Sequence, residues 1–507
     1  MKINIPYKNT NQFSNLVIDY QKHDKSLKEF INYFPDIDNF QKQIHQKKKY
    51  PVNRDVLVDV LEKQNASIDL TNLSVKNLKS LRSENTFTIT TGHQLCLFTG
   101  PLLLFYKIIS SINLSEKLQS RYPNYKFVPV FWMATEDHDF EEINSINLFG
   151  EELVWSSKQR GSVGSMSLDG IEEVLIRMES ILVNSNNAKK LMRLFRSAYM
   201  GHNNLADATR YLINELFGQY GLLIIDGNER VFKQNFLPQI KKDVYHKGFI
   251  DVIRLCSNKI GERYHVQAYA RDINFFDLSN NNRVLIKKSD EFYNLSAEEF
   301  SPNVLLRTLY QESILPNIGI IGGPSEIAYW LQVFNAFKQE DIPYPIIVQR
   351  NCVLIMRQLQ LKKIESLGLN VNDFFDDLDS IYKKYLLNKD ASKISLNDER
   401  VLIRKIYSDI LDKNNDKGLN DNINAELKRQ LKVLDKIELR LVRSAKERES
   451  ISIIQIKKIK NQLFPNNMLQ ERYNNFIPFY LEHGDNFIKI LKNNLDPLDP
   501  NFVVLLD

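Results

Sequence analysis

Apolar runs that end in turns and lead into helical segments constrain this chain most. KFVPVFWMA (126–134) is a continuous apolar run, as a strand buried on both faces is. YGLLIIDG (220–227) predicts a strand that ends in a turn, and YPIIVQR (344–350) predicts a further buried strand. TFTITTG (86–92) alternates and is rich in β-branched residues, and NIGIIGGPSEIAYWLQVFNAF (317–337) is a strand, a Gly-Gly-Pro turn and a helix. Strands that alternate with helices predict an α/β fold with a parallel, doubly wound sheet.

Two segments interrupt this alternation. Residues 151–205 contain the polar loop SSKQRGSVGSM and a helix, which predicts an insertion. Residues 255–310 contain HVQAYARDINFFDL and RVLIKK around the turn SNNN, which predicts an antiparallel hairpin.

The segment from about residue 360 to 465 is charged, poor in glycine and proline, and predicted to be helical throughout. Its apolar residues fall near an a/d pattern that Glu438 interrupts, which indicates a long antiparallel helical pair or a dimerising coiled coil. The members of this stripe are Leu427, Leu431, Leu434, Leu441 and Ala445.

These patterns divide the chain into seven consecutive segments. They are 1–150, the N-terminal helices and the first half of the core; 151–205, a connecting insertion; 206–254, the core continuation; 255–310, a second connecting insertion; 311–360, the second half of the core; 361–465, a helical coiled-coil domain; and 466–507, a C-terminal segment that packs back on the core.

Composition excludes several classes of function. The 67 basic and 62 acidic residues nearly balance, so neither a nucleic-acid nor a membrane partner is expected. The N-terminus has no apolar secretory region, and the apolar runs are too short to cross a bilayer. The three cysteines are far apart and odd in number, which predicts no disulfide framework and a cytoplasmic location.

Three loops fall at the carboxyl ends of predicted strands, where open parallel sheets bind ligands. In the first, TTGHQLCLFTGP (90–101), Gly92 permits a sharp turn, and His93 and Gln94 can then point into a crevice. The amide groups near Gly100 and Pro101 are candidates for binding an anion. The alternative is a plain turn, in which His93 bonds a backbone carbonyl.

The second loop is ATEDHDFEEIN (134–144), directly after an apolar strand. Its four consecutive polar residues, Glu136, Asp137, His138 and Asp139, are candidates for a general base, for amine or hydroxyl recognition, or for metal binding. A solvated helix N-terminus would also favour acidic residues, because the helix dipole attracts them.

The third loop is GGPSE (322–326), where Gly322 and Gly323 permit close backbone approach and Ser325 or Glu326 can reach a ligand. Paired cysteines for structural zinc are lacking, and the chain has neither GxxxxGK[ST] nor GxGxxG, so no metal is predicted and no known nucleotide motif is found.

Five blocks of this sequence together resemble the bacillithiol biosynthesis cysteine-adding enzymes (BshC). The blocks are TGHQLCLFTGPLLLFYKII, VPVFWMATEDHDFEEIN, GLLIIDG, FSPNVLLRTLYQESILPNIGIIGGPSEIAYW and LFPNNMLQERYNNFIPF, in the family's order from about residue 86 to 480. The resemblance implies a Rossmann-like core with connecting insertions and a coiled-coil domain that forms a homodimer. It also implies an architecture similar to class I cysteine ligases and aminoacyl-tRNA synthetases.

The reaction implied by the resemblance joins the carboxyl group of cysteine to the amine of glucosaminyl-malate. On this hypothesis Gly92 to Gln94 bind a substrate or a phosphate, residues 136–139 bind the amine or take its proton, and Gly322 to Glu326 close the floor. Activation of the carboxyl group implies ATP or another nucleotide. Asn303 and Arg307, in FSPNVLLR, either face the substrate or brace the insertion, and Arg472 either joins a second site or forms a salt bridge.

The chain also departs from related patterns. Family members often carry glutamine where His93 stands, the KMSKS loop of class I synthetases is missing, and the zinc ligands of cysteine-specific synthetases are missing. The alternative hypothesis is therefore a synthetase-like dimeric protein that has lost catalysis and binds a nucleotide or metabolite.

Overall fold

The structure, a computed structural model, describes residues 2–279, 282–287, 296–391, 394–413 and 416–507. The chain forms two compact units. One, here called the α/β unit, consists of Phe13–Val353 and Glu471–Val503; the other, the helical unit, consists of Met1–Gln12, Leu354–Gln470 and Val504–Asp507. Both units are discontinuous in sequence.

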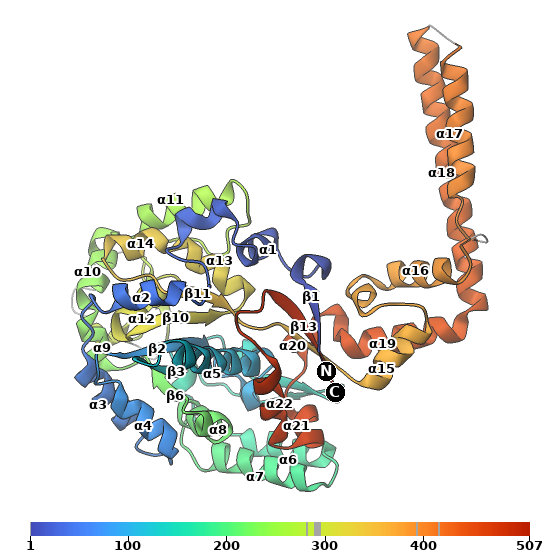
Figure 1. The fold of residues 1–507 in the computed structure, drawn as a ribbon. Helices are drawn as coiled ribbons and strands as arrows, with labels where there is room; N and C mark the ends of the chain where they lie inside the picture. The colour runs from blue at the N-terminus through green and yellow to red at the C-terminus, as the bar shows by residue number, and fades with distance from the viewer. Residues whose placement is uncertain (1, 280–281, 288–295, 392–393, 414–415) are drawn as a thin grey trace. The chain divides into compact units, whose positions relative to one another are not determined.

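A five-stranded parallel sheet lies at the centre of the α/β unit (Figure 1). Its strands, in spatial order, are β11 (Ile346–Gln349), β10 (Asn317–Gly322), β2 (Thr86–His93), β3 (Lys126–Met133) and β6 (Leu223–Asp226). Every neighbouring pair is parallel. Numbered along the chain, the order is 3-2-1-4-5 read from β6, which is that of a Rossmann-like sheet, so the predicted fold class is confirmed. The order reverses between β2 and β10.

The strands are buried along most of their length because helices cover both faces of the sheet. On β3, Val128 and Val130 belong to a cluster that includes Leu61, whereas Phe127 packs on the opposite face with Leu118. The helix that follows the first loop is α5 (Leu103–Arg121), which begins two residues after Pro101.

The remaining helices of the α/β unit precede, connect or follow these strands. They are α1 (Asn15–Gln21), α2 (Asn39–Lys47), α3 (Arg54–Gln64), α4 (Asn72–Ser80), α6 (Ile171–Ile181), α7 (Asn186–Met200), α8 (Leu205–Phe217), α9 (Arg230–Asn235), α10 (Leu237–His246), α11 (Ile250–Gly261), α12 (Leu306–Ile314), α13 (Pro324–Gln332), α14 (Phe334–Gln339), α21 (Ile477–His483) and α22 (Asn486–Asn494).

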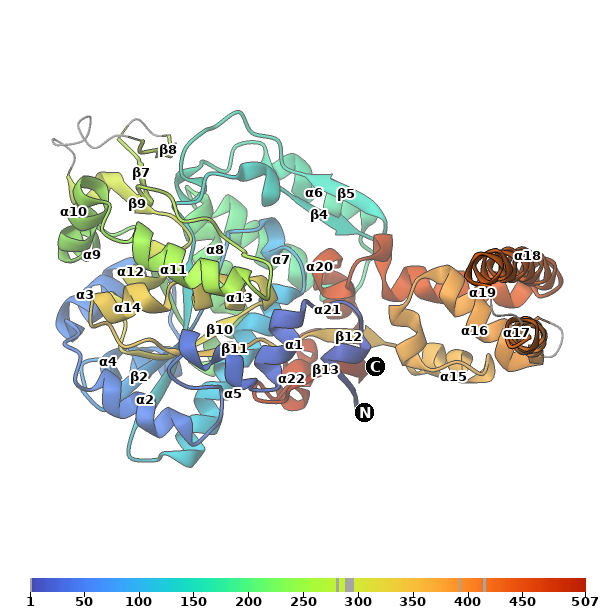
Figure 2. The ribbon, with the colours of Figure 1, turned by 90° about the horizontal axis from the view of Figure 1, so that it is seen from above.

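The two insertions can be followed in Figure 2. The first, residues 151–205, begins with β5 (Glu151–Val154), which pairs antiparallel with the preceding β4 (Ser145–Leu148), and continues with α6 and α7. The second contains the antiparallel sheet of β8 (Val284–Leu285), β7 (Phe275–Asp277) and β9 (Phe300–Pro302). The predicted hairpin is therefore confirmed at β7 and β8. Residues 280–281 of its turn SNNN and residue 288 of RVLIKK lie outside the described residues.

A further sheet is formed by β1 (Lys2–Pro6), β13 (Asn501–Leu506) and β12 (Val353–Met356). The helical unit contains β1 and a set of helices. The helices are α15 (Gln358–Ser366), α16 (Leu378–Asp390), α17 (Asn397–Leu411), α18 (Lys417–Arg448) and α19 (Ser450–Leu463), and α20 (Gln470–Tyr473) leads back to the α/β unit. Within the described ranges, no helix is long and apolar enough to cross a membrane.

Helices α17 and α18 form a long antiparallel pair, one of the two arrangements expected from the a/d stripe (Figure 1). Glu438, which interrupts the stripe, is buried and accepts hydrogen bonds from Lys383 (2.8 Å) and Arg400 (2.6 Å). Arg400, near the start of α17, also donates to Asp435 of α18 at 2.8 Å. The interruption is therefore an ion-paired contact between helices.

Candidate active site

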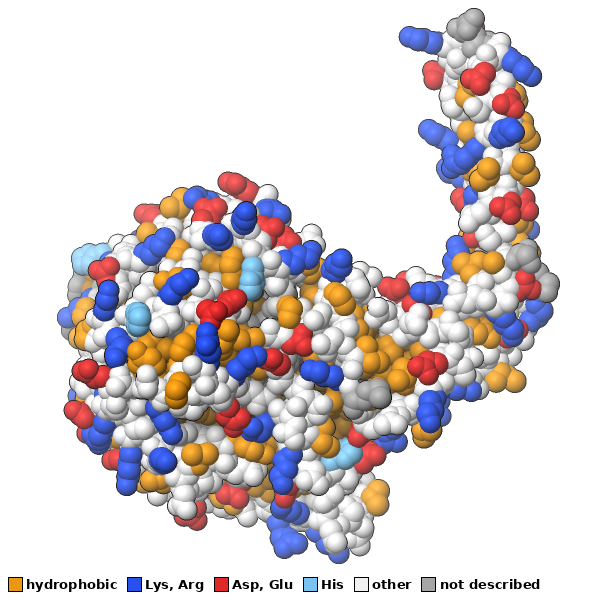
Figure 3. All heavy atoms as spheres, in the orientation of Figure 1, with side chains coloured by type: hydrophobic (Ala, Val, Ile, Leu, Met, Phe, Trp, Pro, Cys, Tyr) orange, Lys and Arg blue, Asp and Glu red, His pale blue; other side chains and the backbone are white. Residues whose placement is uncertain are grey.

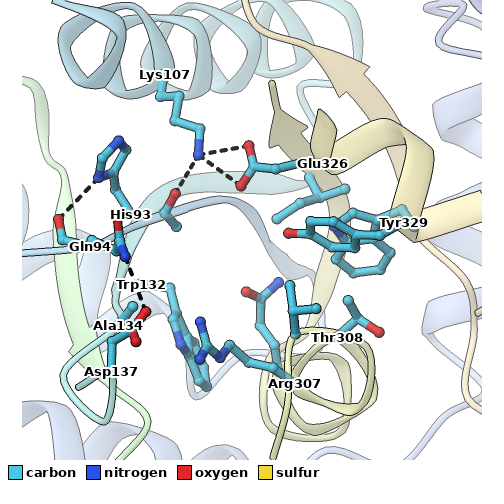
Figure 4. Close-up of a pocket in the computed structure, with 15 residues that line it drawn as sticks. His93, Gln94, Lys107, Trp132, Ala134, Asp137, Arg307, Thr308, Glu326 and Tyr329 are labelled. Carbon is cyan, nitrogen blue, oxygen red and sulfur yellow. Dashed lines mark hydrogen bonds and ion pairs between the residues drawn. The ribbon is translucent and has the colours of Figure 1, made fainter. Parts of the chain in front are cut away.

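A pocket of about 300 Å³ lies at the carboxyl ends of β2, β3 and β10, where the strand order of the sheet reverses. Open α/β sheets bind ligands at such a switch point. Figure 4 shows the polar groups that converge there from β2, α5, α12, α13 and the loop after β3. The lining residues are Gly92, His93, Gln94, Lys107, Trp132, Ala134, Asp137, Val304, Arg307, Thr308, Gln311, Ile320, Glu326, Tyr329 and Trp330.

Lys107 and Glu326 form an ion pair at one end of the pocket. The Lys107 ammonium donates to the Gly92 carbonyl at 2.6 Å and lies 2.7 Å from Glu326 Oε2. Burial lowers the pKa of Lys107, while the Glu326 carboxylate acts in the opposite direction. Glu326 also accepts the Gly323 amide at 2.5 Å, so the same carboxylate caps α13. One pair thus ties α5, β2 and α13 together.

Asp137 carries a negative charge at another side of the pocket. Its carboxylate accepts hydrogen bonds from the Gln94 amide (3.2 Å) and from the His138 backbone amide (2.8 Å). Burial acts to raise the pKa of Asp137, but Arg307, the His138 amide, Arg283 and Gln94 together hold this pKa below its usual value. Asp137 is therefore ionised at neutral pH.

His93 is half-buried at the pocket wall. Its Nδ1 lies 3.0 Å from the Gln94 carbonyl, which requires a proton on Nδ1 and leaves Nε2 as an acceptor. Burial, followed by the charge of Lys107, lowers the pKa of His93 to about 4. The imidazole is therefore neutral at neutral pH. Its bond to a backbone carbonyl is the contact that the plain-turn alternative expected.

The predicted polar cluster is divided by the structure, and only Asp137 lines the pocket. Glu136 is buried with Lys233 of α9, at 2.5 Å between Oε1 and Nζ. His138 is about half exposed, with its Nδ1 3.6 Å from Asp137 Oδ1, and Asp139 is exposed at the start of a short 3-10 turn.

Among the predicted binding residues, Gly92, His93, Gln94, Arg307 and Glu326 line the pocket. The others do not, and each has a structural setting of its own. Gly100 (φ 62°) donates its amide to Leu97 O at 2.8 Å, and the Asn303 carboxamide accepts the amides of Leu305 and Leu306 at the start of α12. The Gly322 carbonyl accepts the Arg350 amide, the Gly323 amide donates to Glu326, and Ser325 is exposed.

Sequence reasoning missed several residues of the site. Lys107 is the single charged residue in the apolar helix segment LLLFYKII, and such a buried cation is a signal that was available. Arg283 approaches Asp137 to 3.8 Å from the second insertion, a contact without any local sequence signal. Besides Lys107, the residues that line the pocket and were missed are Trp132, Ala134, Val304, Thr308, Gln311, Ile320, Tyr329 and Trp330.

The fold and the pocket define a Rossmann-like protein with a small-molecule site at the switch point of its sheet. Two family models cover almost the whole chain. The N-terminal Rossmann-like domain of the bacillithiol biosynthesis protein BshC matches residues 1–351, and the C-terminal coiled-coil domain of BshC matches residues 353–506. The chain belongs to the BshC family, and the resemblance drawn from the sequence is confirmed.

Curated relatives agree along the full length. Proteins named "Putative cysteine ligase BshC" from Flavobacterium johnsoniae and Flavobacterium psychrophilum are 39% and 38% identical to this chain, covering 99% of it and 99% and 98% of their own lengths. One from Christiangramia forsetii is 37% identical, covering 99% of this chain and 98% of its own. A solved structure titled as a putative arginyl-tRNA synthetase from Campylobacter jejuni aligns with a TM-score of 0.21 at 12% identity, covering 85% of this chain and 99% of that one, too low to establish a shared fold.

Proposed function

We propose that this chain joins the carboxyl group of cysteine to the amine of glucosaminyl-malate in the switch-point pocket. The names of the full-length relatives support a cysteine ligase. The observation that carries the proposal is that an ionised carboxylate, Asp137, and a guanidinium, Arg307, both line one pocket. A carboxylate can form an ion pair with an ammonium group, and an arginine can form one with a carboxylate, so the pocket offers an oppositely charged side chain to each kind of substrate group.

The chemistry assigns Asp137 a binding role. In amide formation, the amine nitrogen attacks the activated acyl carbon, the C–N bond forms, and the leaving group departs with its bonding electrons. The ammonium group loses one proton to water before the nitrogen attacks, and the nitrogen loses a second proton to water as the amide forms. Because the pKa of Asp137 is lowered, its carboxylate is a poor proton acceptor and instead holds and orients the amine.

Activation of the cysteine carboxyl group requires a co-substrate, for which we propose ATP or another nucleotide. The two helix starts near the pocket do not fit its phosphates. The Gly323 amide donates to Glu326, whose charge opposes an anion there, and the Gly100 amide donates to Leu97 O. We therefore assign no step to a nucleotide.

An Asp137→Asn variant tests the proposal in cells that lack their own bacillithiol ligase, where any nucleotide needed is present. We expect bacillithiol to fall on the order of 100-fold, because the charge that holds the amine is gone. Ser325→Ala, at an exposed residue that does not line the pocket, is the control and is expected to leave the thiol level intact. Normal bacillithiol with Asp137→Asn, or none with the unaltered chain, would sink the proposal.

We also propose that the chain is a homodimer formed through an apolar face on α17 and α18. Leu402 and Ile406, one helical turn apart on α17, are 60% and 55% exposed, and Ile437 of α18 is 41% exposed. Hydrophobic side chains are visible along this pair in Figure 3. Light scattering should show a dimer that Leu402→Lys with Ile406→Lys converts to a monomer, while Lys405→Gln stays dimeric; a monomeric unaltered chain would contradict this.

We place the protein in the cytoplasm. The support is that Cys96, Cys256 and Cys352 are all buried and that none forms a disulfide, as in reducing compartments. Fractionation of cells that express a tagged chain tests this, and recovery outside the cytoplasm would contradict it.

A further inference from the structure

Arg283, on the hairpin of the second insertion, is held beside the pocket by contacts that fix its guanidinium. This group donates to the Pro302 carbonyl at 2.9 Å and to the Ser301 hydroxyl at 3.2 Å, and it lies 4.0 Å from the ring centroid of Phe276. Its side chain is only 6% exposed. Arg283 is not among the residues that line the pocket.

The remaining donor of Arg283 points toward the loop after β3. Its Nη1 lies 3.8 Å from Asp137 Oδ1 and 3.5 Å from His138 Nδ1. Burial and the charge of Arg307 lower the pKa of Arg283 to about 10, so it stays a cation at neutral pH. Asp137 thus faces two guanidinium groups, Arg283 on the protein side and Arg307 in the pocket.

The charged side chains in and beside the pocket do not cancel one another completely. Lys107 and Glu326 neutralise each other, and Glu136 is paired with Lys233. Glu142 is exposed to solvent and accepts the Gln94 amide at 2.8 Å, so water screens its charge. Against the single charge of Asp137 stand Arg283 and Arg307, and one positive charge is left. Within the described residues, no carboxylate lies within 4.0 Å of the Arg307 guanidinium.

We propose that Arg283 is a positioning residue that neutralises Asp137, so that the Arg307 guanidinium is available to bind an anionic group of the acceptor substrate. This inference rests on the proposed function for the identity of the acceptor, whose malate half carries carboxylates. It adds a role for the second insertion, which supplies no lining residue from its β7–β8 hairpin but sets the charge of the pocket.

Two small probes separate the two sides of the pocket. The affinity for L-malate, which is anionic, should depend on Arg307. The affinity for glucosamine, which is cationic when protonated, should depend on Asp137. The affinities of the full-length protein for each are measured by titration calorimetry at pH 7 and low salt. No ligation is needed for this measurement, so loss of the proposed ligase activity and loss of the anion site are distinguishable.

The Arg283→Met variant should weaken the affinity for malate without weakening the affinity for glucosamine. Without Arg283, Asp137 pairs with Arg307, so malate should bind about tenfold more weakly, while glucosamine binds at least as tightly. Arg307→Met should abolish malate binding, and Arg283→Lys should restore most of it because the charge returns. A variant that merely misfolds would weaken both probes together.

A double variant decides whether Arg283 acts through Asp137. In an Asp137→Asn background, Arg307 has no competing carboxylate, so adding Arg283→Met should change malate affinity less than about threefold. Equal weakening by Arg283→Met in both backgrounds would overturn the proposal. So would malate affinity that is unchanged by Arg283→Met, or unaltered protein that binds no malate.

Discussion

Glu136 and Asp137 are neighbours in the chain, yet they occupy different surroundings at the same edge of the sheet. Glu136 is 7% exposed and faces Lys233, whose side chain is 2% exposed. Asp137 turns the other way and lines the pocket beside Gln94 and Arg307. The turn after β3 separates them, since the Asp137 amide donates back to Ala134 O. Neighbouring acidic residues in a sequence therefore need not share a role, because each role depends on the side chains that the carboxylate contacts in the structure.

The largest effect is expected from Glu136→Gln. This change leaves the buried Lys233 ammonium without its carboxylate, which costs about 3–5 kcal/mol of unfolding free energy. Urea unfolding followed by tryptophan fluorescence measures it, because all three tryptophans, Trp132, Trp155 and Trp330, lie in the α/β unit. Asp139→Asn, an exposed change, is the control and should stay within about 0.5 kcal/mol. If Glu136→Gln leaves stability unchanged but abolishes bacillithiol formation, Glu136 has a role in the reaction, and the contrast with Asp137 is wrong.

An intermediate effect is expected from Glu326→Gln, because Glu326 combines both kinds of role. Glutamine keeps the acceptor that caps α13, but the charge opposite Lys107 is lost. Since Glu326 is about a quarter exposed at the pocket, we expect unfolding free energy to fall by about 1–2 kcal/mol, less than for Glu136→Gln. The same urea titration checks this, and a loss as large as that of Glu136→Gln would show that exposure to the pocket makes no difference.

The smallest effect is expected from His93→Gln, which tests the role of the imidazole. The folded protein keeps His93 neutral down to about pH 4, whereas the unfolded chain protonates it near its ordinary pKa of about 6.5. His93 therefore lowers stability as pH falls from about 6.5 to 4. The glutamine variant should lose less stability over this window, and bacillithiol formation at pH 7 should change less than about threefold. A steeper loss in the variant would contradict the lowered pKa.

Much of the fold was predictable because burial on both faces leaves a continuous apolar signature. The runs that contain β3, β6, β10 and β11 stand out for this reason, and the parallel order then places three loops at one edge. The helical pair followed from apolar spacing, although Glu438 looked like a break until its partners Lys383 and Arg400 were located.

The side chains of the site were harder to predict, because their directions depend on contacts made over long stretches of sequence. Lys233 is almost a hundred residues from Glu136, and Arg283 is further still from Asp137. Asn303 could face the substrate or brace the insertion, and in the structure its carboxamide accepts the amides of Leu305 and Leu306 at the start of α12. Residue type alone does not separate a helix cap from a ligand contact.

The burial of the three cysteines has a consequence for a catalyst that handles thiols. Burial raises the pKa of the Cys96 thiol to about 12 and also raises the pKa of Cys256, so both stay protonated and unreactive. Disulfide exchange needs an accessible thiolate. When cysteine or bacillithiol becomes oxidised during stress, this protein offers no surface sulfur with which those disulfides can exchange, and it escapes covalent capture by its own substrate and product.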